Sequence, residues 1–176
     1  ALAYRGVDAR LSPTQRSAAT PALRLLLTDA RLEQHGIWAA RRLSPGSMIL
    51  LRSDTLSAQA RRRLIRTLRR IARARRCRLL VAGESPDAAR RLGADGVHLR
   101  DRSVRGAAQA RRLNLIVSMP VHNPREARRA ACAGTDHALI SPLYATRSHV
   151  GAKPLTLRQW LTLARMTHAQ PVALAA

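Results

Sequence analysis

Seven short apolar runs alternate with stretches of helical periodicity, and this alternation constrains the fold more than any other feature of the sequence. The runs cover residues 23–28, 48–51, 78–81, 96–99, 113–117, 137–140 and 171–174. Strands that are apolar throughout and alternate with helices indicate an α/β protein with a covered parallel sheet, either doubly wound or closed into a barrel. The spacing of the units is typical of a compact TIM-type (β/α) barrel.

Seven strands do not close an eight-stranded barrel, so the sequence predicts an incomplete barrel whose C-terminal units are missing. The barrel domain is expected over residues 23–176, after a flexible N-terminal extension over residues 1–22 that lacks sustained periodicity. An open barrel exposes the edges of its first and seventh strands, and exposed edges pair readily with other chains. We therefore expect a homo-oligomer, a longer natural chain or poor behaviour in solution.

The segment over residues 57–76 is the clearest predicted helix. Its apolar stripe consists of Leu64, Ile65, Leu68, Ile71 and Ala72, and its opposite face carries Arg61, Arg62, Arg66, Arg69, Arg70 and Arg73. The whole chain has a formal net charge of +22. Either arginine occupies solvated helix faces throughout, or the chain is a basic module that binds nucleic acid. Aromatic residues make up only 2% of the chain, which favours non-specific contact with nucleic acid over base stacking.

Redox and targeting features are few. Cys77 and Cys132 have no spacing typical of zinc ligands, and we expect both to be buried reduced thiols. The opening residues contain no apolar run of the length that a signal peptide needs, and no stretch is long enough to span a membrane. The sequence therefore predicts a cytoplasmic protein without membrane contact.

Two polar segments follow predicted strands, where barrel enzymes place their active sites. The segment from Ser141 to Leu155 contains hydroxyl groups, cationic side chains and a permissive glycine, which suit a phosphate-binding loop; a plain polar surface loop is the alternative. His122 follows another strand and is either a site residue or only a junction residue, with Asn123 as the cap of the next helix. The stretch GADGVHL over residues 93–99 reads as a helix end, a turn and a strand that contains His98.

These segments resemble the thiamine phosphate synthases and the related TenI-type thiazole tautomerases. The resemblance rests on LLLTD (25–29), LLR (50–52), GADGVHL (93–99), the junction at 122–127 and SPLYATRSHVGAKPL (141–155). It implies a (β/α)8 barrel of thiamine biosynthesis that joins hydroxymethylpyrimidine diphosphate to thiazole phosphate with Mg²⁺ and releases pyrophosphate. The partners it implies are phosphorylated pyrimidine and thiazole small molecules.

The resemblance also assigns individual residues. Arg52 is similar to the family arginine that contacts the diphosphate, Thr146 and Ser148 to the hydroxyls of the phosphate loop, His149 to a basic position and Gly151 to the loop glycine. For Mg²⁺ the implied ligands are Glu84 and Asp101.

Several positions depart from the family pattern where the chemistry takes place. Asp54 stands where the family has lysine, Gly83 and Glu84 replace an Asn-Asp pair, and Ser103 and Pro120 replace an aspartate and a serine. The alternative to a synthase is therefore a TenI-like protein that binds a thiazole or phosphorylated ligand without joining two substrates.

Overall fold

A computed structural model describes residues 24–29, 33–52, 55–100, 103–143 and 154–173. Its seven strands are β1 (Leu25–Asp29), β2 (Met48–Arg52), β3 (Arg78–Ala82), β4 (Gly96–His98), β5 (Ile116–Val121), β6 (His137–Ile140) and β7 (Gln170–Ala173). Its six helices are α1 (Glu33–Ala40), α2 (Ala58–Ala74), α3 (Pro86–Leu92), α4 (Val104–Arg112), α5 (Pro124–Ala133) and α6 (Leu157–Thr167). The predicted N-terminal extension, residues 1–22, lies outside the described residues.

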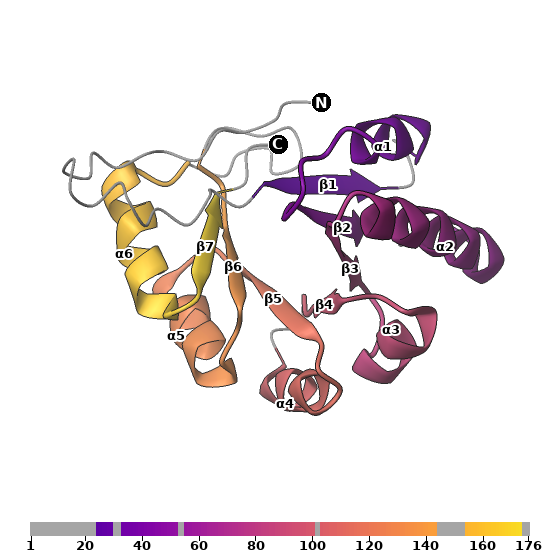
Figure 1. The fold of residues 1–176 in the computed structure, drawn as a ribbon. Coiled ribbons are helices and arrows are strands. Elements are labelled where there is room, and N and C mark those ends of the chain that lie inside the picture. The colour runs from indigo at the N-terminus through magenta and orange to yellow at the C-terminus, as the bar shows by residue number, and fades with distance from the viewer. Residues whose placement is uncertain (1–23, 30–32, 53–54, 101–102, 144–153, 174–176) are drawn as a thin grey trace.

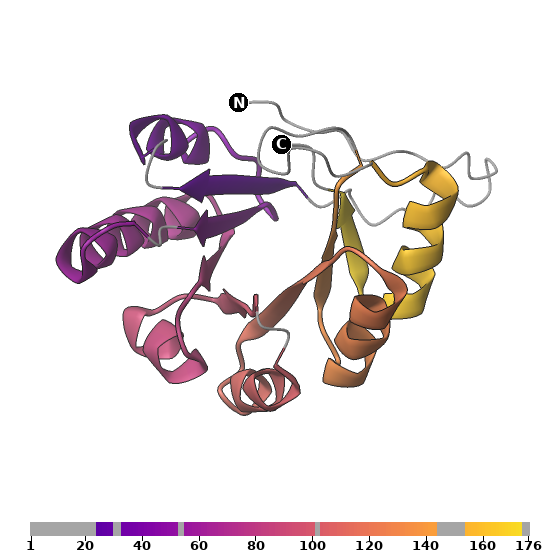
Figure 2. The same cartoon turned by 180° about the vertical axis from the view of Figure 1, so that it is seen from behind.

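The strands form one parallel sheet in the order in which they occur along the chain. Figures 1 and 2 show the sheet curving into an arc, with the helices on its outer side. Within the described residues, β1 pairs with β2 and β7 pairs with β6, and no pairing joins β1 to β7. The predicted α/β fold, an incomplete TIM-type barrel of seven strands, is confirmed. Self-association through the two open edges stays a prediction.

Alternate residues of the strands build two apolar layers, because successive side chains of a strand point to opposite faces. The outer layer joins the strands to the helices and includes Leu51, Val81 and Val97. The inner layer, inside the arc, contains Met48, Leu50, Leu80, Ala82, Leu139 and Val172. This alternation determines which residues at the strand ends can reach the interior of the half-barrel.

Helix α2 follows the predicted apolar stripe closely. Leu64, Ile65, Leu68 and Ala72 are buried, and the hydroxyl of Ser57 caps the helix by accepting a hydrogen bond from the backbone N–H of Ala60. The prediction that Arg61 belongs to a solvated face is wrong, since only 8% of this residue is exposed. Arg61 lies in the first turn of the helix, where the neighbouring turn after β3 covers it.

Two further expectations are corrected. The fifth strand runs from Ile116 to Val121 and not over 113–117, because Leu113 still caps α4 and Asn114 takes a positive φ of 55° that ends the helix. Cys77 is buried as expected, and burial raises the pKa of its thiol. Cys132 is exposed, because it lies on the outward face of α5, opposite the alanines that pack on the sheet.

The same junction precedes β4 and β6. Gly93 and Gly134 end their helices in the left-handed conformation, with φ of 73° and 60°. Two residues later, the carboxylates of Asp95 and Asp136 accept hydrogen bonds of 2.8 Å from the backbone N–H groups of Leu79 and Val117, respectively. Each aspartate thereby fastens the start of one strand to its neighbour. Among the described helices, none is long and apolar enough to cross a membrane.

Candidate functional site

The inner row of residues continues beyond the apolar layer to the carboxyl end of the sheet. Met48 and Leu50 of β2 belong to the inner layer, so Arg52, two residues further, belongs to the same row. On β4, Val97 packs outward and His98 therefore faces inward. Strand register places His98 between Ala82 of β3 and Ser118 of β5. Arg52 and His98 end their strands, and Ser118 of β5 is in register with His98, so the three residues lie at one level inside the half-barrel.

His98 and Ser118 form a buried polar pair at this level. The Nδ1 atom of His98 lies 2.9 Å from the Oγ of Ser118, and His98 is only 6% exposed while Ser118 is fully buried. Burial, together with the smaller effects of the positive charges of Arg52 and Arg100, lowers the pKa of His98 to about 4. The imidazole is therefore neutral at pH 7, so arginine side chains supply the positive potential here.

A second histidine connects the ends of β5 and β6. The Nδ1 of His122 lies 2.8 Å from the backbone carbonyl oxygen of Ser141, which accepts hydrogen bonds only, so Nδ1 carries the proton. The backbone N–H of His122 donates to Oε2 of Glu126 at 2.8 Å, and the side chain of Asn123 caps α5 as predicted. His122 therefore orients the junction between these two strands, as the junction interpretation expected.

The predicted phosphate loop begins beside His122. Thr146, Ser148, His149 and Gly151 lie outside the described residues. The residues that flank this segment are described: the backbone N–H of Leu155 donates to the carbonyl oxygen of Pro142 at 2.8 Å. This hydrogen bond joins the two flanks next to Ser141, at the carboxyl end of β6. The flanks thus lie at the same edge of the sheet as Arg52 and His98.

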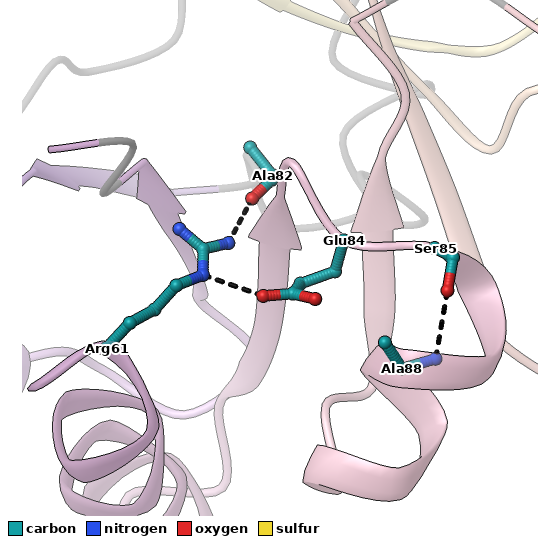
Figure 3. A network of polar contacts seen from close by, with 5 residues as sticks. All are labelled: Arg61, Ala82, Glu84, Ser85 and Ala88. Carbon is teal, nitrogen blue, oxygen red and sulfur yellow. Dashed lines mark hydrogen bonds and ion pairs between the residues drawn. The ribbon is translucent and has the colours of Figure 1, made fainter. Parts of the chain in front are cut away.

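Glu84, one of the two predicted Mg²⁺ ligands, is engaged by an arginine. The Nε of Arg61 donates to Oε1 of Glu84 at 2.7 Å, and the same guanidinium donates to the carbonyl oxygen of Ala82 (Figure 3). The side chains are 10% and 21% exposed, respectively, so the pair is largely shielded from water. Figure 3 shows the carboxylate of Glu84 directed towards α2, from which Arg61 projects.

The described residues do not supply a set of Mg²⁺ ligands. Asp101, the other predicted ligand, lies outside them, and the carboxylate of Glu84 faces a cation. Ser103, where the resemblance expects an aspartate, caps α4 by accepting a hydrogen bond of 3.0 Å from the backbone N–H of Gly106. No group of three or more His, Cys, Asp or Glu side chains that could hold a metal ion occurs in residues 24–29, 33–52, 55–100, 103–143 and 154–173.

Arg52 is exposed at the end of β2, where its backbone is in register with Asp29 of β1. The structure thus places one of the predicted ligand-binding residues on the same inner face as the buried pair of His98 and Ser118, with β3 between them, and its charge acts on His98. Sequence reasoning missed the pairing role of Ser118 and the contribution of Arg100. The period-two pattern of β4 and β5 could have indicated that His98 and Ser118 share a face, but their register depends on the sheet.

Comparison with known proteins agrees with this architecture. Residues 25–175 match the family model TMP-TENI, described as thiamine monophosphate synthase. The putative thiamine-phosphate synthase 2 of Aquifex aeolicus is 31% identical over 112 residues, which are 63% of this chain and 60% of that protein. The thiamine-phosphate synthase of Anaeromyxobacter dehalogenans is 36% identical over 101 residues, which are 56% of this chain and 44% of that protein.

A solved structure, the thiamine phosphate pyrophosphorylase from Pyrococcus furiosus, is similar in fold. The TM-score is 0.71 at 20% sequence identity, with 86% of this chain and 74% of that chain covered. The matches to the curated relatives span between 24% and 60% of the length of those proteins. Since the family model matches all of the strands and helices described above, the chain belongs to the TMP-TENI family of thiamine monophosphate synthases.

Proposed function

We propose that the carboxyl edge of this half-barrel binds hydroxymethylpyrimidine diphosphate and thiazole phosphate and joins them to thiamine phosphate. The observation that carries the proposal is the placement of Arg52 on the inner face, in the same row as the buried pair of His98 and Ser118, in a chain of the TMP-TENI family. The reaction breaks the bond between the pyrimidine methylene carbon and the diphosphate oxygen. It forms a bond from that carbon to the thiazole nitrogen and releases pyrophosphate.

In this proposal Arg52 holds the diphosphate and stabilises the negative charge that grows on it as the carbon–oxygen bond breaks. A guanidinium suits this role because it stays charged and can donate two parallel hydrogen bonds to phosphate oxygens. Thr146, Ser148, His149 and Gly151 remain proposed residues of the phosphate loop.

His98 acts as a positioning residue in this scheme. Its pKa of about 4 keeps the imidazole neutral, and its hydrogen bond to Ser118 joins the end of β4 to the middle of β5. Because the ring is neutral, it neither offsets the positive charge of Arg52 nor adds a charge of its own. Because the described residues do not form a Mg²⁺ site, no step of this scheme uses the metal, and coordination by Glu84 and Asp101 stays a prediction.

A second function is favoured by the engagement of Glu84 with Arg61 and by the capping role of Ser103. Glu84 and Ser103 stand at positions where the resemblance expects metal ligands, and both make structural contacts instead. The chain would then bind a thiazole or phosphorylated ligand at the same edge without joining two substrates.

The decisive experiment incubates the full chain with both substrates, with and without Mg²⁺, and measures thiamine phosphate. We expect product formation that Arg52→Gln reduces by about 100-fold, in keeping with the loss of a charged contact to a developing anion. Arg128→Gln, on the exposed face of α5, removes the same charge and should leave the rate unchanged.

Absence of product under both conditions would reject the ligation. Calorimetric titration with thiazole phosphate, pyrophosphate and thiamine phosphate then tests the second function. Binding that requires Arg52 supports it, and no heat with any of the three ligands rejects it.

A further inference from the structure

A basic hollow lies at the opposite end of the sheet from the proposed ligation site. It has a volume of about 600 Å³ and is lined by Arg69 and Arg73 of α2, Arg78 of β3, Arg90 of α3, and residues of the turns before β4 and β5. Arg78 begins β3 and Ile116 begins β5, so the hollow adjoins the amino ends of these strands. The length of β3 alone separates it from the carboxyl edge by about 13 Å.

The charges around the hollow are unbalanced. Asp95 is the carboxylate in its lining, and this side chain already accepts a hydrogen bond from the backbone of Leu79 and pairs with Arg78 at 3.5 Å. Among the described residues, no carboxylate forms an ion pair with Arg69, Arg73 or Arg90. Three guanidinium groups therefore surround the hollow without an anionic partner.

Arg69 is held in place although its hydrogen-bonding capacity is incompletely used. Its Nε is buried and has no hydrogen-bond partner in the described residues. Its guanidinium packs against Gly93, where a Cβ atom would collide with it. A buried donor without a partner is costly, and an arginine fixed by packing loses little freedom when a ligand binds. These features suit a binding site whose ligand supplies a hydrogen-bond acceptor for Arg69.

A second, smaller hollow continues along α2. It has a volume of about 180 Å³ and is lined by Arg66, Arg69, Arg70 and Arg73, so the two hollows share Arg69 and Arg73. Positive charge near a helix C-terminus interacts favourably with the helix dipole, which explains why Arg73 stands in the last turn of α2 and Arg90 in the last turn of α3. The dipole does not account for arginines that converge on a concave surface from α2, α3 and β3.

We propose that this basic hollow, built around Arg69, Arg73 and Arg90, is a second ligand site for a small anion that carries several linked phosphate groups, such as a triphosphate. Linked phosphates need several guanidinium groups that line one surface, and the two hollows, which share Arg69 and Arg73, provide them. No aromatic side chain lines either hollow, so the site can bind phosphate groups but has no aromatic surface on which a base could stack. The proposal is independent of the ligation at the carboxyl edge.

The test is a calorimetric titration of the full chain with sodium tripolyphosphate at about 0.15 M salt, where contacts to isolated surface charges are screened. We expect saturable binding that R69Q/R73Q weakens by about tenfold or more, as the loss of charge-assisted hydrogen bonds predicts. The matched control R128Q/R129Q removes two exposed arginines of α5 and should change the affinity by less than about twofold. Arg52→Gln removes the proposed diphosphate contact at the carboxyl edge and should leave the binding that depends on Arg69 and Arg73 intact, which separates the two sites.

Three results would overturn the proposal: no saturable binding, equal weakening by both double variants, or loss in Arg52→Gln of the binding that depends on Arg69 and Arg73. Titration with a single-stranded oligonucleotide of about 20 nucleotides tests whether the surface binds nucleic acid instead. If it binds at least about tenfold more tightly than tripolyphosphate and requires Arg69 and Arg73, the surface serves nucleic acid and the small-anion site is rejected.

Hydrogen exchange of the unmodified chain keeps the test decisive if R69Q/R73Q does not fold. Tripolyphosphate should then slow exchange in the segments 66–79 and 90–96. Protection confined to the carboxyl ends of the strands would contradict the proposed site.

Discussion

Arg61 and Glu84 join the first turn of α2 to the turn after β3 through an ion pair of 2.7 Å. Arg61 also donates to the carbonyl oxygen of Ala82, so one guanidinium binds both the last residue of the strand and the carboxylate that follows it (Figure 3). The pair is largely shielded from solvent. It fixes the carboxyl end of β3, next to the site proposed for ligation, and it takes up the carboxylate that the resemblance assigns to Mg²⁺.

Breaking this pair should destabilise the fold. Glu84→Gln leaves a nearly buried guanidinium without its charged partner, and we expect a loss of about 1–3 kcal/mol in the free energy of unfolding, less than for a fully buried pair. Urea unfolding measures this loss. A double-mutant cycle with Arg61→Met should show that the two losses are not additive, because either change removes the same interaction. Arg62→Gln, at an exposed neighbour, is the control, and an additive cycle would contradict the coupling.

The same variant separates a structural role of Glu84 from a metal-binding one. If Glu84 serves Arg61, Glu84→Gln should change stability and leave the concentration of Mg²⁺ that gives half-maximal ligation within about twofold of the unmodified chain. A metal ligand behaves differently, since losing one carboxylate from a Mg²⁺ site should raise that concentration by about tenfold or more. A Mg²⁺ titration of the activity at saturating substrate decides between the two roles.

Much of the fold could be predicted because it depends on local periodicity. The apolar stripe of α2, the cap at Asn123 and the glycine at the end of α3 all follow from residue spacing. The fifth strand was misplaced because Leu113 and Leu115 look like strand residues, whereas the positive φ of Asn114 turns the chain between them. Apolar content alone does not distinguish the end of a helix from the start of a strand.

The site was less predictable, because its contacts join residues far apart in the sequence. The pairs Arg61 with Glu84 and His98 with Ser118 depend on which helix lies beside which strand and on strand register. The spacing of Gly93 to Asp95 and of Gly134 to Asp136 offers a local signal that could have been used. In both copies a helix end is followed two residues later by a strand-fastening carboxylate, before β4 and before β6.

The strand-fastening carboxylates provide a stability prediction. Asp136→Ala should lower the free energy of unfolding by about 1–2 kcal/mol, because the backbone N–H of Val117 loses its acceptor. Asp136→Asn retains an oxygen that can accept the same bond and should lose less. Denaturant unfolding of the two variants measures the difference, and equal losses would show that the hydrogen bond is not the cause.

The positive charge of Arg52 should be measurable at His98. Because Arg52 is one of the causes that lower the pKa of His98, Arg52→Gln should raise that pKa. Burial is the larger cause and persists, so the pKa should remain below the usual value near 6.5. A titration of the imidazole resonances by NMR tests this, with Arg128→Gln as the control of equal charge. An unchanged pKa would mean that Arg52 does not face His98 in solution.

The buried imidazole of His98 also makes stability depend on pH in a defined window. Its pKa falls from 6.5 in the unfolded chain to about 4 in the fold, so between these values the unfolded chain binds a proton that the folded chain does not. Stability from this group is therefore complete above about pH 6.5 and is lost as the pH falls towards 4.

Between pH 7 and 4.5, the unmodified chain should lose about 2 kcal/mol more than His98→Gln in the free energy of unfolding, judged from the size of the pKa shift. Urea unfolding at both values measures the difference, and His35→Gln, at an exposed histidine of α1, should lose as much as the unmodified chain. Equal losses in His98→Gln and the unmodified chain would contradict a neutral buried imidazole.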